Sequence, residues 1–203
     1  MKTYKILGLF LSYPTEDALG HWDEMMAVLE QEELLPVQHR ENLAEFVAHF
    51  KTQNIYQIQE NYVDSFDQGA AHSLHLFDHL YSESQMRGQA MHRLVETYAE
   101  KGLYIVPGEM PDYLPLFLEF LSVCPAEEAV DFLGNLITVM AIIGVRLRKR
   151  ESRYGVIFKA LEALSKVRPD DKKVADAGLE PSEEGIGLED GGRDYKRDEA
   201  AVY

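Results

Sequence analysis

The stretch that decides the fold runs from residue 126 to residue 149 and reads AEEAVDFLGNLITVMAIIGVRLRK. A stripe of apolar side chains repeats at helical spacing, and a second set widens it: Val130, Leu133, Ile137, Met140, Ala141 and Gly144, then Leu136, Val139, Ile142 and Ile143. A helix that is apolar over so much of its girth is central, with other helices around it. The charges at its ends match a helix dipole, with acids first and basic residues last: Glu127, Glu128, Arg146, Arg148 and Lys149. The stretch therefore predicts the core helix of an all-α protein.

Helical spacing recurs on the N-terminal side of this stretch. Three shorter segments place apolar residues on one face, and these are Leu43, Phe46, Val47 and Phe50, then Ile55, Ile58, Tyr62 and Phe66, then Leu114, Phe117, Leu118 and Leu121. No segment alternates apolar and polar residues as a half-buried strand does. Residues 103–106, Leu-Tyr-Ile-Val between Gly102 and Pro107, come closest, and we interpret them as an extended connection. The expected fold is a single-domain bundle of about seven or eight helices without a sheet.

The composition changes after residue 168. Residues 169–203 hold 11 acidic and 5 basic residues and five glycines, and their apolar periodicity is lost. Few apolar residues and high net charge favour a flexible segment. We therefore predict a helical domain over 1–168 and a flexible acidic tail over 169–203, with a last helical turn over 170–177 left open.

Charge narrows the classes of partner. The chain carries 35 acidic and 20 basic residues, a formal net charge of −15. Nucleic acid is excluded as a partner because binding it requires Lys and Arg to neutralise phosphates. A basic peptide or protein surface fits better, since complementary charge speeds encounter. Solubility alone also accounts for an acidic surface.

The single cysteine and the apolar runs bear on the cellular location of the protein. Cys124 cannot form a disulfide within the chain, and its position at the end of an apolar pattern indicates a buried thiol. The N-terminal MKTYKILGLFLSYP lacks a small-residue cleavage site and is interpreted as a first helix. The apolar run 129–145 is shorter than the ~20 residues of a membrane span. We expect a cytoplasmic protein without stable membrane insertion.

Three histidines raise one enzyme hypothesis. His72, His75 and His79 would share one face of a continuous helix, as zinc ligands do, and Glu83 could follow them as a fourth ligand. The chain has no Glu beside the first histidine to activate water. It also lacks the GxGxxG, Walker A and GxSxG motifs. The alternative is that these histidines are surface or hydrogen-bonded residues.

Three motifs between residues 62 and 119 are more specific. They read YVDSFDQG at 62–69 with SLHLFDH at 73–79, ESQMRGQAM at 83–91, and EMPDYLPLFLE at 109–119, and RESRY at 150–154 follows them. Together they resemble the NarJ family of nitrate reductase assembly chaperones, within the TorD-like group of redox-enzyme maturation proteins. The resemblance runs in order from about residue 4 to about residue 165. The Glu-x-Pro-Asp-Tyr-Leu-Pro stretch is the group's signature, and Arg-Gly-Gln-Ala-Met is particular to the nitrate reductase branch.

The resemblance implies an all-helical chaperone without catalytic activity or cofactor of its own. Such proteins bind the N-terminal peptide of the apo catalytic (alpha) subunit of nitrate reductase, a remnant resembling a twin-arginine leader. They hold that subunit in the cytoplasm for molybdenum cofactor insertion and assist its membrane docking. Partner alternatives left open are another molybdoenzyme of the sulfoxide or amine-oxide reductase type, a homodimer, and a helical adaptor acting through the tail.

The motifs supply the expected partner-peptide-binding residues. An apolar groove for an amphipathic helix, an aromatic wall and an acidic rim would come from Tyr62, Phe66, Asp67, Leu76, Phe77, Arg87, Met91, Glu109, Asp112, Tyr113 and Glu119. Phe66 and Phe77 also fit a core, and Asp112 also fits an N-cap for a helix beginning near Tyr113. Arg87 could pair with Asp67 or Glu119 within the fold or contact the partner.

Overall fold

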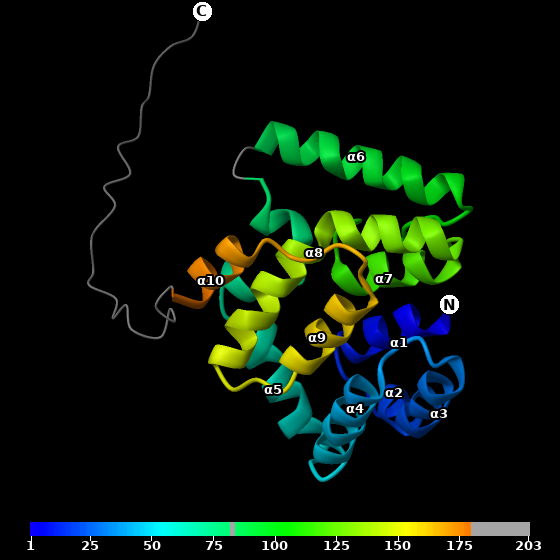
Figure 1. Cartoon of the computed structure of the whole chain (residues 1–203), viewed down its shortest axis with the longest axis vertical. Helices are drawn as coiled ribbons and strands as arrows, with labels where there is room; N and C mark the ends of the chain where they lie inside the picture. The colour runs from blue at the N-terminus through cyan, green and yellow to red at the C-terminus, as the bar shows by residue number, and fades with distance from the viewer. Residues whose placement is uncertain (82–83, 180–203) are drawn as a thin grey trace, which may run out of the picture.

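The computed structural model of the chain describes residues 1–81 and 84–179, and it is helical throughout (Figure 1). Over these ranges it has ten α-helices, two short 3-10 helices and no strand. They are α1 (Lys2–Phe10), α2 (Glu16–Gly20), α3 (Trp22–Glu32), α4 (Val37–Phe50), α5 (Ile55–Phe66), η1 (Ala70–His72), η2 (Leu76–His79), α6 (Ser84–Glu100), α7 (Leu114–Val123), α8 (Ala126–Lys149), α9 (Gly155–Leu164) and α10 (Asp171–Leu179). The all-α prediction is confirmed.

Helix α8 is the centre of the bundle, as its sequence predicted. It contacts α7, α9, α10 and both 3-10 helices. Leu133, Ile137 and Met140 on its predicted stripe are fully buried. Pro125 precedes it at the N-cap position, and the expected acids and basic residues stand in its first and last turns. Sequence and structure therefore agree on the residues that form α8, on the charges at its two ends and on its central position.

Length alone does not separate α8 from a membrane helix. By length and composition α8 could cross a membrane, and it is the one such helix among residues 1–81 and 84–179. The apolar run 129–145 is shorter than a span, but the whole helix Ala126–Lys149 is long enough for one. Its contacts with α7, α9 and α10 are those of a core helix.

Aromatic side chains join α4, α5 and α9. Phe46 and Phe50 of α4 and Phe66 of α5 all contact the ring of Tyr154, with centroid separations between 4.9 and 5.4 Å. Tyr154 is 1% exposed. Each such ring pair contributes about 0.5–1.5 kcal/mol beyond area burial. The apolar stripes predicted for residues 43–50 and 55–66 therefore meet at the start of α9.

Helix α1 packs closely on the start of α7. A Cβ at Gly8 would lie 3.0 Å from the carbonyl oxygen of Pro115, so glycine permits this close approach without displacing the backbone of α7. The first amides of α1 find their acceptor in α3, where the Glu32 carboxylate accepts from the backbone N–H groups of Lys2 and Thr3, both at 2.8 Å. A side chain from another helix thus caps α1.

The count of seven or eight helices was too low. Residues 16–32 form two helices that meet at His21, which closes α2 and precedes α3. Residues 171–179 form α10, a full helix where the sequence left one turn open. The connection 103–106 carries no helix or strand, as expected. The rest of the expected flexible tail 169–203, from residue 180 onward, lies outside the described residues.

Candidate functional site

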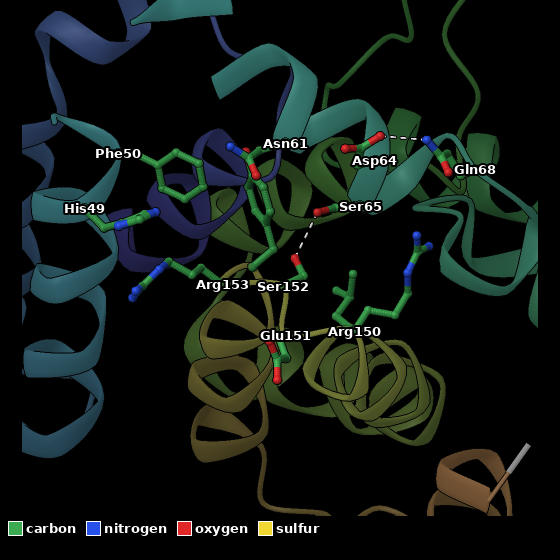
Figure 2. A pocket seen from close by; sticks show the side chains of 12 residues that line it. His49, Phe50, Asn61, Asp64, Ser65, Gln68, Arg150, Glu151, Ser152 and Arg153 are labelled. Carbon is green, nitrogen blue, oxygen red and sulfur yellow. Dashed lines mark hydrogen bonds between the residues drawn. The ribbon is translucent and has the colours of Figure 1, made fainter. Parts of the chain in front are cut away.

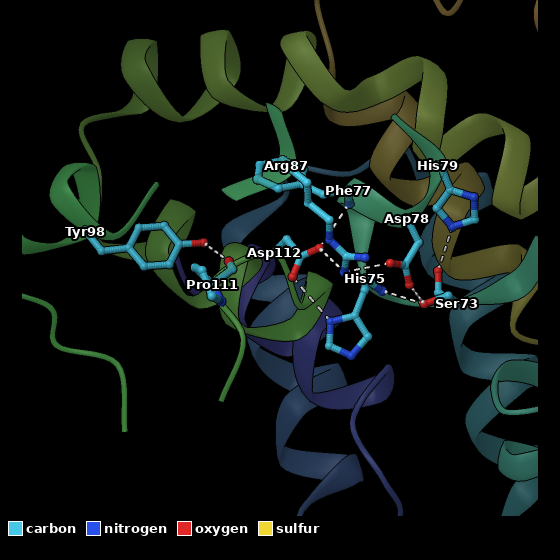
Figure 3. A network of polar contacts seen from close by, with 9 residues as sticks. All are labelled: Ser73, His75, Phe77, Asp78, His79, Arg87, Tyr98, Pro111 and Asp112. Atoms are coloured by element: carbon cyan, nitrogen blue, oxygen red, sulfur yellow. Dashed lines mark hydrogen bonds and ion pairs between the residues drawn. The ribbon is translucent and has the colours of Figure 1, made fainter. Parts of the chain in front are cut away.

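Asp112 lies at the centre of a network of polar contacts in the motif-bearing stretch 62–119, which we call the signature region (Figure 3). Its side chain is fully buried. One carboxylate oxygen accepts from the backbone N–H of Phe77 at 3.1 Å, and the other lies 3.3 Å from Nδ1 of His75. A buried carboxylate is tolerated only when hydrogen bonds replace its water. Asp112 therefore ties the segment before α7 to the start of η2.

The expected role of Asp112 as an N-cap is wrong. Tyr113 occupies the N-cap position of α7 and makes no side-chain cap bond. The backbone explains this arrangement, because Leu76 N–H donates to the Asp112 carbonyl and Leu114 N–H donates to the Leu74 carbonyl. These two bonds turn the Asp112 side chain toward η2. Pro115 lies in the first turn of α7, as expected.

Arg87 links α6 to this network. Its guanidinium lies 2.7 Å from the Asp78 carboxylate and 3.9 Å from that of Asp112. The expected pairing with Asp67 or Glu119 is not formed. Glu119 instead pairs with Lys5 of α1 at 2.8 Å, and Asp67 is an exposed residue that closes α5. Arg87 is thus a clamp within the fold.

The three histidines do not share a helix. His72 ends η1 and His79 ends η2, with an extended backbone between them. His79 Nε2 lies 2.9 Å from the Ser73 carbonyl oxygen, whereas His75 faces Asp112. Among the described residues, no three His, Cys, Asp or Glu side chains are grouped to hold a metal ion. The zinc hypothesis required that the three histidines share one face of a helix, and this prediction is therefore wrong. Its fourth ligand, Glu83, lies outside the described residues.

Local environments shift the pKa values of two partly exposed histidines in opposite directions. The hydrogen bond with Asp112 raises the pKa of His75, whereas burial lowers the pKa of His79. The Asp112 carboxylate thus favours a charged His75, and burial favours the neutral form of His79.

Most of the expected apolar groove residues lie in the core. The exposed fractions of Tyr62, Phe66, Leu76 and Phe77 are between 0% and 7%. The hydroxyl of Tyr62 donates to the Leu11 carbonyl at 3.1 Å. Met91 on α6 is partly buried against the core. These four core side chains cannot line an open groove in this conformation, because their neighbours cover them.

Three of the expected polar residues instead line an open hollow on the surface. Glu109, Tyr113 and Glu119 line a cavity of about 260 Å³ between α1, α7 and the connection before it. Its apolar wall comes from Leu9, Val106, Pro115 and Leu116. The structure thus brings these three expected residues together in one surface region, and α1 supplies a wall that the sequence did not indicate.

A second hollow extends the first along α1. It measures about 390 Å³ and lies between α1 and α3, with Ile6, Met25, Val28 and Glu24 in its lining. Lys5 and Leu9 of α1 line both hollows, so the two lie on either side of α1, and we call the pair together the α1 groove. The two hollows combine apolar side chains with three glutamates and the lysines Lys2 and Lys5. Apolar area beside carboxylates suits an amphipathic helix that carries basic residues.

Comparison with known proteins places the chain in a family. Residues 32–165 match the family model described as nitrate reductase delta subunit. The chain belongs to this family. The match contains Arg87, Asp112 and the whole signature region, so the resemblance seen in the motifs is confirmed.

Named relatives agree with the family. The chain is 37% identical to the nitrate reductase molybdenum cofactor assembly chaperone NarJ of Escherichia coli, over 84% of this chain and 72% of that protein. It is 34% identical to the probable chaperone NarW of Escherichia coli, over 81% and 68%. It is 30% identical to the probable chaperone NarJ of Bacillus subtilis, over 79% and 86%. These names are those of assembly chaperones and not of catalytic enzymes, in line with the sequence-based prediction.

Proposed function

We propose that this chain is a cytoplasmic assembly chaperone for the molybdenum-containing catalytic subunit of respiratory nitrate reductase. It binds the N-terminal peptide of the apo subunit and holds that subunit for cofactor insertion and membrane docking. Family membership supports the partner class. The α1 groove carries the proposal for the peptide, since it is an open apolar surface that includes Glu109, Tyr113 and Glu119 of the signature region.

The groove suits the chemistry of a basic amphipathic peptide. Its partly exposed leucines, Leu9 and Leu116, offer apolar area without unfolding the core. Glu24 and Glu109 stand at its two ends, and Glu119 already holds a cation, the Lys5 ammonium. An arginine of a bound peptide would replace or join Lys5 there. Charge at the rim speeds encounter, and apolar contact provides most of the affinity.

Calorimetric titration of the full chain with the N-terminal peptide of the nitrate reductase catalytic subunit tests this. The sharpest variant is Val106→Asp, because Val106 lines the groove and is 67% exposed. We expect affinity to fall about tenfold, the value of one lost apolar contact of about 1.4 kcal/mol. Tyr104→Asp is the matched control, since it adds the same charge on the same connection at a residue 83% exposed and outside the groove lining.

Three results would count against the proposal. Absence of peptide binding by a folded chain removes the peptide mechanism. Equal losses in both variants indicate general charge repulsion by the connection and not contact in the groove. Tighter binding of the leader of a sulfoxide or amine-oxide reductase would reassign the chain to another molybdoenzyme.

A further inference from the structure

The two hollows of the α1 groove share one turn of α1. Lys5 and Leu9 line both of them, and residues four apart in a helix are neighbours on the same face. A ligand that reaches from one hollow to the other therefore crosses α1 at this turn. The two hollows then contact different parts of the same ligand, and their charges differ.

The hollow between α1 and α7, which we call the α1–α7 hollow, is acidic. Glu109 and Glu119 line it, and Asp67 lies near the phenol of Tyr113 in its lining. Burial raises the pKa of Tyr113, and the charges of Glu109 and Asp67 raise it further. Among the described residues, Lys5 is the one cation that lines this hollow. Carboxylates therefore outnumber cations here.

The hollow between α1 and α3, which we call the α1–α3 hollow, has the opposite balance. Among the described residues, its lining has one carboxylate, that of Glu24, against Lys2, Lys5 and His21. The hydrogen bond with the Asp17 carbonyl raises the pKa of His21, and the charges of Asp17 and Glu24 raise it further. The charge of Glu24 is thus partly engaged by His21. The remaining walls of this hollow are apolar: Ile6, Leu9, Met25 and Val28.

Lys5 stands between the two hollows and pairs toward the acidic one. Its ammonium lies 2.8 Å from the Glu119 carboxylate, and the two side chains are 52% and 47% exposed. An ion pair this exposed is weak, so a cation of a ligand can displace Lys5 at little cost. The displaced ammonium stays beside the α1–α3 hollow, which makes that hollow still less suited to a basic residue.

We propose that the two hollows divide the bound peptide by charge, so that its basic residues lie in the α1–α7 hollow against Glu109 and Glu119 and its uncharged apolar residues lie in the α1–α3 hollow against Met25 and Val28. The apolar stems of arginine and lysine pack on the wall that includes Val106, while their charged ends reach the carboxylates. The thioether of Met25 adapts to apolar side chains of different shape. This inference rests on the proposed peptide binding and adds the direction in which the peptide crosses α1.

A third hollow provides a control outside the α1 groove (Figure 2). It measures about 420 Å³ and lies between α5 and the turn that joins α8 to α9. Arg150 and Arg153 line it together with Asp64 and Glu151, and burial lowers the pKa of the nearby His49. Its charges therefore balance, and a basic peptide gains no net attraction there. Glu151 is thus an exposed carboxylate that lines a hollow without attracting the peptide.

Calorimetric titration of the full chain with the N-terminal peptide of the nitrate reductase catalytic subunit tests this division. Glu109→Gln, Glu24→Gln and Glu151→Gln each remove one exposed carboxylate from a different hollow. We expect Glu109→Gln to weaken binding about fivefold and the other two to change it by less than about twofold. The loss in Glu109→Gln should disappear in about 1 M salt, where the screening length is about 3 Å.

Val28→Thr tests the apolar side without a change of charge. The added hydroxyl must lose water when the peptide covers it, so binding should weaken about threefold at low and at high salt. A peptide whose arginine and lysine residues are replaced by glutamine completes the comparison. With this peptide, Glu109→Gln should cause no further loss, whereas Val28→Thr should keep its own.

Two results would overturn the division by charge and leave peptide binding intact. A loss in Glu24→Gln as large as that in Glu109→Gln would place basic residues in the α1–α3 hollow. Equal changes in all three glutamine variants would show that binding does not depend on where the carboxylates lie. Absence of binding by the folded, unaltered chain is a different result, which removes the proposed peptide mechanism and this inference with it.

Discussion

The hydroxyl groups of Tyr62 and Tyr113 lie 3.2 Å apart. Since the proton of Tyr62 goes to the Leu11 carbonyl, Tyr113 donates to Tyr62. The chain of bonds joins three parts of the molecule, the end of α1, the middle of α5 and the start of α7. It fixes Tyr113 at the edge of the α1 groove.

Tyr62→Phe removes the centre of this chain. The Leu11 carbonyl and the Tyr113 hydroxyl each lose a partner, so we expect the free energy of unfolding to fall by about 1 kcal/mol. Urea denaturation measures it. Tyr56→Phe is the control, because Tyr56 lies on the same helix and is 79% exposed. A change no larger than the control's would show that the bonds add nothing to stability.

Asp112→Ala should be more damaging than Asp112→Asn. Alanine leaves the buried N–H of Phe77 without an acceptor, which costs about 1–3 kcal/mol. The asparagine amide oxygen can still accept from Phe77 and so preserves part of the stability. Thermal unfolding of both variants tests this order. If the asparagine variant is as unstable as the alanine variant, then the negative charge, with its partners His75 and Arg87, is the main contribution.

His75 and His79 should give stability opposite dependences on pH. The folded pKa of His75 is raised, so its contribution is present below the ordinary histidine value and is lost as pH rises through the folded pKa. The folded pKa of His79 is lowered, so its contribution is present above the ordinary value and is lost as pH falls below it. Urea titrations of His75→Gln and His79→Gln between about pH 5 and about pH 8 separate the two. Parallel profiles for the two variants would contradict the assignment.

Two helical glycines should respond to alanine with opposite signs. A Cβ at Gly144 of α8 would lie 2.7 Å from the Phe158 Cβ, and the strain should cost about 1–3 kcal/mol. A Cβ at Gly88 of α6 meets nothing within 4 Å, so alanine should add about 0.5–1 kcal/mol of stability. Denaturation midpoints decide the signs. The open space around Gly88 also means that it does not serve close helix packing.

The sequence predicted the features that depend on residues within a few helical turns of one another, which are the helices and their apolar faces. The stripes of α4, α5, α7 and α8 follow from spacing alone, because a helix must bury its apolar face. The same stripes could not tell a core position from a groove position. Phe66 is core because Tyr154, far along the chain, covers it.

Roles that depend on distant partners were not predictable. An aspartate before a helix is usually a cap, but Asp112 turns to an amide 35 residues away. The histidine spacing suggested one helix, but the extended backbone at Ser73 and His75 interrupts it. Helix α1 as a groove wall gave no local signal, since its apolar residues look alike whether they face the core or a partner.

The pairing of α1 with α7 also governs when the α1 groove can form. Lys5 and Glu119 are 114 residues apart, and they meet at the middle of the α1 groove. During synthesis, the first helix must wait for the seventh to emerge from the ribosome before it can settle. Contacts this far apart in sequence slow folding. The groove therefore forms late, after most of this chain has been translated.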